Sequence, residues 1–294
     1  MTAWKLGIIG GSGIYALEGL ADARWVTAES PWGAPSDQLL TGSLDGTDLV
    51  FLPRHGRGHR VPPHLLNARA NIDVLKRLGC TDVLAVSAVG SLNQAMAPGQ
   101  FVAVDQFIDR TKGRPSSFFG EGLVAHVPMA DPVCPRLTAM AATAARAAGA
   151  LVHERATYLA MEGPQFSTRA ESRLYRQWGC DVIGMTAMPE ARLAREAELP
   201  YALLAMVTDY DCWHEGGDVD VPEILRLMAA NAAIARAAVK ALVAALPAVR
   251  APSPIDTVLD MALITAPEAR DWAALEKLDA VMERILRKAG DAAD

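Results

Sequence analysis

The sequence lacks the features that mark several classes of protein. No run in its 294 residues approaches the roughly 18 unbroken apolar residues of a membrane span. The chain enters a strand within a few residues of its start and has no basic flank there, which is unlike a signal peptide. A formal net charge of −6 leaves no excess of Lys and Arg for nucleic acid or an anionic membrane surface. We therefore expect a cytoplasmic protein with neither nucleic acid nor membrane as a partner.

Motifs for metal binding and redox chemistry are also missing. The four cysteines lie far apart and form no C-x-x-C pair, which is typical of reduced thiols in the cytoplasm. The six histidines show no ligand spacing such as H-E-x-x-H. No Gly-Lys-Ser/Thr follows the N-terminal glycine turn, which excludes a Walker A loop. We expect neither a metal nor an organic cofactor.

Short apolar segments alternate with helical segments along the first 250 residues. The segment 82–87 has too little polar alternation for a half-exposed strand, which indicates a sheet covered on both faces. Strands are expected at residues 5–9, 48–53, 82–87, 100–104, 156–161, 181–184 and 201–208. Helices are expected at residues 65–79, 134–148, 168–178, 189–198 and 222–246. This alternation predicts one α/β domain with a central mixed, largely parallel, twisted β-sheet flanked by helices.

The last part of the chain departs from this alternation. Residues 251–254 contain two prolines and are typical of a linker. Apolar residues at helical spacing then predict one amphipathic helix over residues 269–288. Its apolar positions are Trp272, Leu275, Leu278, Val281, Met282 and Ile285. We therefore divide the chain into a main domain, residues 1–250, and a linker with a C-terminal helix, residues 251–294.

Three of the expected strands end in groups that bind anions. A glycine turn with Ser12 follows the first strand, where backbone amides and the hydroxyl can hold phosphate. Arg54 and His55 follow a second strand, and arginine grips oxyanions with paired hydrogen bonds. Ser87 and Ala88 add a hydroxyl and backbone amides at the end of a third. Because open α/β sheets bind ligands at the carboxyl ends of their strands, the three segments together predict a phosphate site.

The same glycine turn also fits a different function. Gly11-x-Gly13-x-x-Ala16 matches the dinucleotide fingerprint, and Glu29 lies at the spacing expected for a ribose ligand. Residues 15–24 barely provide the crossover helix that this fingerprint requires. An NAD-dependent dehydrogenase therefore stays open as an alternative.

Two aspartates follow the apolar strand 201–208. Asp209 and Asp211 point to the same side if extended geometry continues through them, because strand side chains alternate. Such a pair can grip the edge of a heterocycle, bind a metal or perform acid–base chemistry. Tyrosine and tryptophan surround the pair and no second acidic cluster supplies further oxygen ligands, which disfavours a metal. Phe166, in a loop after another strand, is suited to lie against a flat ring.

Seven motifs occur in an order that matches one enzyme family. They are Gly-Gly-Ser-Gly, Pro-Arg-His-Gly-Arg, Val-Ser-Ala-Val-Gly-Ser-Leu, Asp-Gln-Phe-Ile-Asp-Arg-Thr, Glu-Gly-Pro-Gln-Phe-Ser-Thr-Arg-Ala-Glu, Gly-Met-Thr-Ala-Met-Pro-Glu and Thr-Asp-Tyr-Asp-Cys-Trp. Over roughly residues 5–245 the chain resembles the S-methyl-5′-thioadenosine phosphorylases, within the trimeric purine nucleoside phosphorylase family. The resemblance implies a nucleoside phosphorylase domain over residues 1–250 and leaves the C-terminal helix unexplained. It implies that phosphate, as co-substrate, displaces adenine from the nucleoside and yields S-methyl-5-thio-α-D-ribose 1-phosphate.

The resemblance also implies roles for individual residues. The family's phosphate site falls on Ser12, Arg54, His55, Ser87, Ala88 and Thr186. Met185 matches a ribose contact, Phe166 the ring beside the base, and Val221 an apolar residue around the methylthio group. His126 matches a histidine that a neighbouring subunit of a homotrimer offers to the 5′ end of the nucleoside.

The two aspartates take specific roles in the implied reaction. Asp209 is the candidate acid for purine N7, which requires that burial and the neighbouring Asp211 raise the pKa of the pair. Asp211 would accept from the 6-amino group, where a 6-oxopurine would leave a buried acceptor unpaired. Relatives that prefer 6-oxopurines have Glu and Asn in the places of Ser167 and Asp209, so we expect selectivity for adenine. A nucleoside-binding protein without catalytic activity stays a third alternative.

Overall fold

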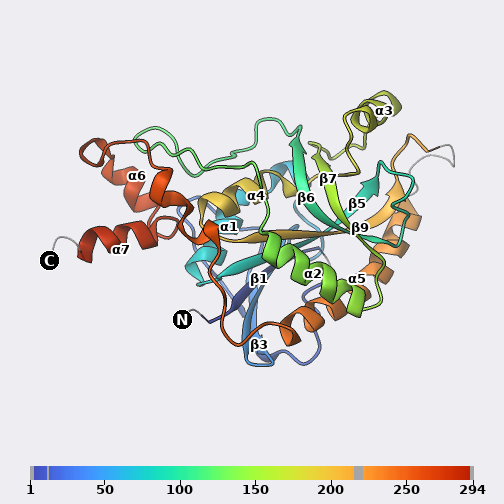
Figure 1. Ribbon diagram of the computed structural model, residues 1–294, viewed down its shortest axis with the longest axis horizontal. Helices are drawn as coiled ribbons and strands as arrows, with labels where there is room; N and C mark the ends of the chain where they lie inside the picture. The colour runs from blue at the N-terminus through green and yellow to red at the C-terminus, as the bar shows by residue number, and fades with distance from the viewer. Residues whose placement is uncertain (1–2, 12, 215–220, 292–294) are drawn as a thin grey trace.

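A nine-stranded sheet forms the centre of the molecule, with helices on both of its faces (Figure 1). The computed structural model describes residues 3–11, 13–214 and 221–291, with side chains described as far as Lys288. Ser12, one of the expected phosphate ligands, lies outside the described residues. The strands are β1 (Lys5–Gly10), β2 (Ala21–Val26), β3 (Leu39–Leu44), β4 (Thr47–Pro53), β5 (Asp82–Ser91), β6 (Phe101–Asp109), β7 (Val152–Ala160), β8 (Val182–Gly184) and β9 (Tyr201–Tyr210).

The sheet is mixed, as the sequence predicts. Its order is β2-β3-β4-β1-β5-β8-β7-β6-β9, and five of the strand pairings are parallel while four are antiparallel. Because β9 pairs with both β6 and β5, the second half of the sheet closes on itself. β5 and β9 run in parallel, and their register places Gly90 beside Asp209. The carboxyl ends of these two central strands therefore meet at one place.

Helices cover both faces of the sheet and form two main cores, beside one smaller cluster of buried apolar residues. The α-helices are α1 (Ala68–Arg77), α2 (Pro135–Ala147), α3 (Arg169–Gln177), α4 (Ala187–Glu196), α5 (Val221–Ala244), α6 (Trp272–Lys277) and α7 (Glu283–Asp291). Side chains of β5 alternate between the cores: Val83 and Ala85 pack with α1 and α4, whereas Leu84 and Val86 pack with α2 and α5. Burial on both faces explains why residues 83–86 of this strand are all apolar.

Helix α5 is the one helix in the described part of the chain that is long and apolar enough to cross a membrane. In the fold it packs against α2 and β9 and buries Asn231, Ala235, Val239 and Leu242. Core helices share this length and composition, so we interpret α5 as a core helix.

The described residues of the N-terminal segment do not contain the crossover helix that the dehydrogenase alternative requires. Residues 13–47 are all described and contain the antiparallel strands β2 and β3 but no helix. Neither strand was predicted from the sequence. β2 is an exposed edge strand, and β3 has Thr41, Gly42 and Ser43 at its centre in place of alternating apolar residues. A dinucleotide fingerprint needs a helix directly after the glycine turn. The dehydrogenase prediction is therefore wrong for this fold.

The C-terminal segment is broken where one helix was predicted. Helix α6 begins after its cap Asp271 and ends at Lys277, and α7 starts only at Glu283. Between them, the Asp279 carboxylate accepts from the backbone amide of Ala280, a local bond that competes with helical geometry. Leu278, Val281 and Met282 pack into the core of α1 and α4. By contrast, Trp272 is 84% exposed, so this part of the predicted apolar face does not pack on the core of its own chain.

Candidate active site

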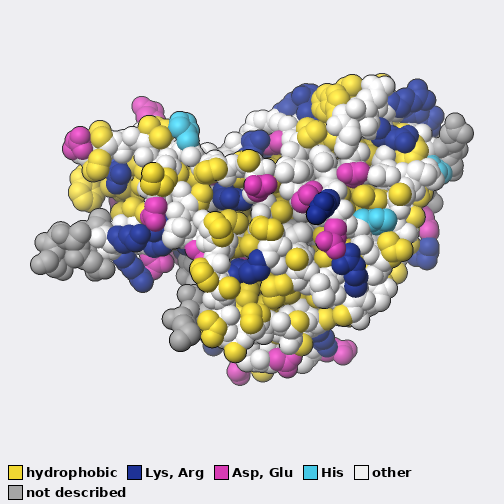
Figure 2. Space-filling view, in the orientation of Figure 1, with side chains coloured by type: hydrophobic (Ala, Val, Ile, Leu, Met, Phe, Trp, Pro, Cys, Tyr) yellow, Lys and Arg dark blue, Asp and Glu magenta, His cyan; other side chains and the backbone are white. Residues whose placement is uncertain are grey.

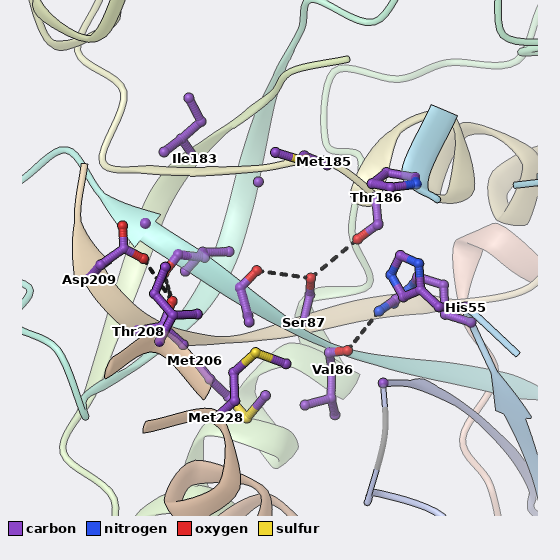
Figure 3. A pocket seen from close by; sticks show the side chains of 18 of the residues that line it. His55, Val86, Ser87, Ile183, Met185, Thr186, Met206, Thr208, Asp209 and Met228 are labelled. Atoms are coloured by element: carbon purple, nitrogen blue, oxygen red, sulfur yellow. Dashed lines mark hydrogen bonds between the residues drawn. The ribbon is translucent and has the colours of Figure 1, made fainter. Parts of the chain in front are cut away.

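A cavity of about 240 Å³ opens at the carboxyl ends of β1, β4, β5 and β9. Most of the expected site residues line it: Arg54, His55, Ala88, Ser87, Phe166, Met185, Thr186, Asp209 and Asp211. Figure 3 shows His55, Ser87 and Thr186 on one side of the cavity and Asp209 with Thr208 on the other. We call the first group, together with Arg54, the oxyanion end, and the two aspartates the carboxylate end.

Arg54 is the buried cation of the oxyanion end and is only 2% exposed. Its Nε and Nη2 donate to the Glu190 carboxylate at 2.9 and 3.1 Å, and its Nη1 donates to the Val86 carbonyl at 2.8 Å. Glu190 also accepts from the Tyr201 hydroxyl at 2.8 Å. These bonds use three of the five guanidinium N–H groups and fix the plane of the side chain beside the cavity. Glu190 ends one of the quoted motifs, but its contact with Arg54 was not anticipated.

His55 is neutral at physiological pH. Burial lowers the pKa of His55 to about 4, with Arg54 and His59 adding to the effect and the bond to Val61 opposing it. The ring Nδ1 lies 2.9 Å from the Val61 carbonyl, which can only accept, so Nδ1 carries the proton. Nε2 is then left as an acceptor. His59, which sequence analysis passed over, stacks on His55 with ring centroids 4.3 Å apart and also lines the cavity.

Two hydroxyls complete the oxyanion end in the described part of the chain. Ser87 Oγ from β5 and Thr186 Oγ1 lie 3.2 Å apart, and both side chains are buried. Thr186 directly precedes α4, so its position is set by the start of that helix. The arginine and the two hydroxyls offer donors to a tetrahedral oxyanion, and the neutral imidazole offers an acceptor for a hydroxyl of that anion.

The carboxylate end is built over Gly90. A Cβ at this position would lie 3.1 Å from Asp209 Oδ2 and 3.7 Å from the Asp211 Cβ, so both aspartates face the same glycine. This confirms the expectation that they point to one side. Burial raises the pKa of Asp209 to about 6, Asp211 raises it further, and the 2.8 Å bond from the Thr208 hydroxyl opposes both.

Asp211 is buried more deeply, at 3% exposure. Burial raises its pKa as well, and the nearby Ser172 hydroxyl, Cys212 amide and Ser167 hydroxyl oppose that shift, although Ser172 Oγ and Asp211 Oδ2 make no hydrogen bond of normal geometry to a described residue. Ser172 lies on α3, is fully buried, and was not singled out in the sequence. Ser167 lies beside the Asp211 carboxylate and does not line the cavity.

Two further expected residues, Val221 and His126, do not line the cavity of their own chain. Val221 is 51% exposed at the first turn of α5, and Ile224 and Met228, further along the helix, line the cavity instead. Val221, Ile224 and Met228 are at helical spacing and share one face of α5, but only Ile224 and Met228 reach the cavity wall. His126 is exposed, and its backbone amide donates to the Ala262 carbonyl at 2.8 Å, away from the cavity of its own chain.

Metal binding has no support in the described residues. They contain no group of three or more His, Cys, Asp or Glu side chains that could hold an ion. The expectation that the site needs neither metal nor organic cofactor stays a prediction.

Comparison with known proteins assigns the fold to a family. The model of the phosphorylase superfamily matches residues 5–245, more than four-fifths of the chain. The chain belongs to the phosphorylase superfamily. This family membership agrees with the α/β sheet and the oxyanion end described above.

Individual phosphorylases are similar along nearly the whole chain. The S-methyl-5′-thioadenosine phosphorylase of Cereibacter sphaeroides is 59% identical over 285 residues, covering 96% of this chain and 98% of the relative. That of Bradyrhizobium diazoefficiens is 57% identical and covers 98% of this chain and 100% of the relative. These alignments extend well into residues 251–294, further than the resemblance expected from the motifs.

Solved phosphorylase structures share the same architecture. A methylthioadenosine phosphorylase from an antarctic soil metagenomic library superposes with a TM-score of 0.91 at 46% identity, covering 96% of this chain and 99% of the other. A mutant of the adenosine/methylthioadenosine phosphorylase of Schistosoma mansoni, solved with methylthioadenosine, has a TM-score of 0.76 at 35% identity and covers 95% and 98%.

Proposed function

We propose that this protein cleaves S-methyl-5′-thioadenosine with phosphate to give adenine and S-methyl-5-thio-α-D-ribose 1-phosphate. The observation that carries the proposal is a single cavity with an oxyanion end and a carboxylate end facing each other. The names of the phosphorylases that match nearly the whole chain support the same reaction. In it, a phosphate oxygen bonds to the anomeric carbon while the bond to purine N9 breaks and its electrons move into the purine.

The oxyanion end holds the phosphate nucleophile in this proposal. Arg54 and the hydroxyls of Ser87 and Thr186 donate to its oxygens, and Ser12 and the Ala88 amide add to them by family resemblance. His55 is neutral with Nε2 free to accept, so it suits the hydroxyl of a hydrogen phosphate. A phosphate fixed in this way stabilises the positive charge that develops on the ribosyl ring.

The carboxylate end receives the purine. Asp209 has a pKa of about 6, so part of the population carries a proton near neutral pH, and this proton can pass to N7 as the base leaves. Asp211 Oδ2 is buried without a hydrogen-bond partner among the described residues, so it can accept from the 6-amino group. A 6-oxopurine places an acceptor against it, and this mismatch favours adenine over hypoxanthine.

The ribose and the methylthio group lie between the two ends. Met185 and Phe166 line this part of the cavity, together with Ile224 and Met228 of α5. Their apolar surfaces suit the C–H face of the sugar ring and the thioether, which form no strong hydrogen bonds. Phe166 is half exposed at the cavity mouth, where a bound purine ring would cover it.

The direct test is a phosphorolysis assay. Purified protein mixed with S-methyl-5′-thioadenosine and phosphate should release adenine in proportion to the phosphate consumed. Release of adenine without phosphate would identify a hydrolase, and binding without release would identify a nucleoside-binding protein; either result refutes the proposal. Dialysis against EDTA should leave the rate unchanged, since we propose that the reaction uses no metal.

We further propose a cytoplasmic homotrimer in which His126 completes the cavity of a neighbour. Residues 122–126 run beside the C-terminal segment, with Ile264 donating to the Val124 carbonyl at 2.9 Å. This surface exposes Val124, Met261, Ile264 and Trp272 at 39%, 94%, 59% and 84%. The lobe that contains α6 and α7 accordingly shows hydrophobic side chains on its surface (Figure 2). Clustered exposed apolar side chains of this kind mark interfaces between chains.

A head-to-tail contact of this surface with the cavity mouth of the next chain closes into a ring. Phe166 is an exposed apolar group at this mouth, and Val221 and Leu225 are exposed in the first turns of α5, the helix whose Ile224 and Met228 line the cavity. Mixed oligomers of His126→Ala and Asp209→Asn chains test the arrangement. If sites are shared, some sites regain both native groups, and the activity exceeds the average of the two parent variants. An activity equal to that average would place His126 outside its neighbour's site.

A further inference from the structure

Arg114 lies in the connection between β6 and α2, which runs from the carboxyl end of β6 across the molecule towards α6 (Figure 1). Its side chain is 6% exposed and does not line the cavity. Its guanidinium nevertheless donates to two loops of the site. Nη1 donates to the carbonyls of Met185 and Met188 at 2.7 and 3.0 Å, and Nη2 donates to the Glu162 carbonyl at 2.6 Å.

The carbonyls of Met185 and Met188 lie between the end of β8 and the first turn of α4. Met185 and Met188 lie on either side of Thr186, which belongs to the oxyanion end, and Met185 itself lines the cavity. Arg114 therefore holds the backbone on both sides of Thr186, at the start of α4.

The loop after β7 contains the other carbonyl and leads to Phe166. Arg114 Nε donates to the Glu162 carboxylate at 3.1 Å, and the same oxygen accepts from the Lys112 amide at 2.7 Å. The two loops also interlock directly, since a Cβ at Gly163 would lie 2.5 Å from Met185 Sδ. A shift of either loop would thus move the other.

The chemistry of this contact requires a guanidinium. Arg114 uses four hydrogen bonds in one plane to satisfy three carbonyls and a carboxylate, and Glu162 neutralises its charge. A lysine ammonium is a point donor that cannot span both loops. Buried carbonyls that lose their donor are costly, so the loops would move apart or admit water.

We propose that Arg114 is a positioning residue that fixes the β7 and β8 loops, so that Phe166, Met185 and Thr186 meet nucleoside and phosphate in one geometry. This inference rests on the proposed phosphorolysis. Thr186 serves the phosphate and Met185 and Phe166 serve the nucleoside. Loss of Arg114 therefore impairs the use of both substrates together, although Arg114 contacts neither.

Arg192 provides a matched control. It lies on α4 and pairs with Asp109, the last residue of β6, at 3.2 Å, close to the connection that contains Arg114. It is 42% exposed and is not among the residues of the cavity wall. Arg192→Ala thus removes a cation from the same neighbourhood without freeing either loop.

The test compares Arg114→Lys, Arg114→Ala and Arg192→Ala with the wild type in steady-state phosphorolysis. We expect kcat/KM to fall about 100-fold in Arg114→Ala for methylthioadenosine and for phosphate alike, because small misplacements of positioned groups cost this much. Arg114→Lys keeps the charge beside Glu162 and should fold, with a loss of about tenfold in kcat/KM.

Guanidinium ion added at non-denaturing concentration should restore part of the activity of Arg114→Ala but none to Arg114→Lys. Arg192→Ala should stay within about twofold, as is usual for an exposed ion pair.

The outcomes separate this inference from the proposed function. A wild type that releases no adenine refutes the function itself. An active wild type together with an Arg114→Lys variant of equal kcat/KM refutes the positioning role. If Arg114→Ala is folded by circular dichroism and only one substrate's kcat/KM falls, the joint fixing of the two loops is refuted.

Discussion

The two ends of the cavity solve the problem of buried charge in opposite ways. At the oxyanion end, Arg54 is compensated by Glu190 and His55 is held neutral. At the carboxylate end, Asp211 is buried and Asp209 is partly buried, and the raised pKa of each is opposed only by neutral groups. Compensation fixes a charge in place, whereas an uncompensated carboxylate gains a proton. One end is therefore suited to hold an anion and the other to deliver a proton.

The strongest test of this contrast is Asp209→Asn. An amide cannot deliver the proton, and removal of a general acid typically costs about 10²–10⁴ in rate, so we expect kcat/KM for methylthioadenosine to fall by about 1,000-fold. The amide can donate to N7 of a 6-oxopurine, so activity on methylthioinosine should fall less. The ratio of the two kcat/KM values is the measurement. An unchanged ratio would contradict the assignment of Asp209 to the purine.

At the compensated end, Glu190→Gln should act mainly on stability. Removing one partner of a buried pair leaves an uncompensated charge on Arg54, with a cost of roughly 3 kcal/mol in the free energy of unfolding. Phosphate supplies the missing anion when it binds. The variant should thus melt several degrees lower, and saturating phosphate should raise its Tm more than that of the wild type. Equal phosphate-induced shifts in both proteins would show that Arg54 does not reach the anion.

At the carboxylate end, the stability of the folded protein should depend on pH. The folded pKa of Asp209 is raised from 3.8 to about 6, so the folded protein binds this proton more tightly than the unfolded chain does. This contribution to stability is present below about pH 4 and is lost as the pH rises through about 6. Asp209→Asn removes the effect and should be more stable than the wild type at about pH 7.5, by on the order of 2 kcal/mol. Denaturant unfolding at acidic and at neutral pH measures it; a difference that does not change with pH would contradict the shifted pKa.

Sequence and structure agree where a local pattern determines the outcome. Residues 82–87 form a strand buried on both faces because their apolar side chains serve two cores, and Thr168 caps α3 with a capping box as its position suggests. Gly90 lets Asp209 and Asp211 share one side, which alternation alone predicted. Patterns within about ten residues carry such information.

Contacts between distant segments could not be read in the same way. Arg54 and Glu190 are 136 residues apart, and only the pairing of β4 beside β1 and the course of α4 bring them together. Arg114 likewise reaches loops 48 and 71 residues away. Strands β2 and β3 lack the apolar alternation that identifies a strand, because one is an exposed edge. The Arg54–Glu190 contact, the contacts of Arg114 and the strands β2 and β3 all depend on the pairing of distant segments, which no local sequence pattern encodes.

The smallest expected effect concerns the hydroxyl that faces Asp211. Ser172 is fully buried on α3, and its hydroxyl, close to the carboxylate, lowers the pKa of Asp211 against the effect of burial. In Ser172→Ala the carboxylate loses this nearby polar group and binds a proton more readily, so it becomes a poorer acceptor for the 6-amino group. We expect kcat/KM for methylthioadenosine to fall about fivefold near neutral pH and less at higher pH, because the contact is weaker than a full hydrogen bond to a charged group, which contributes about 1.5–3 kcal/mol. A uniform loss across the pH range would instead assign Ser172 to packing alone.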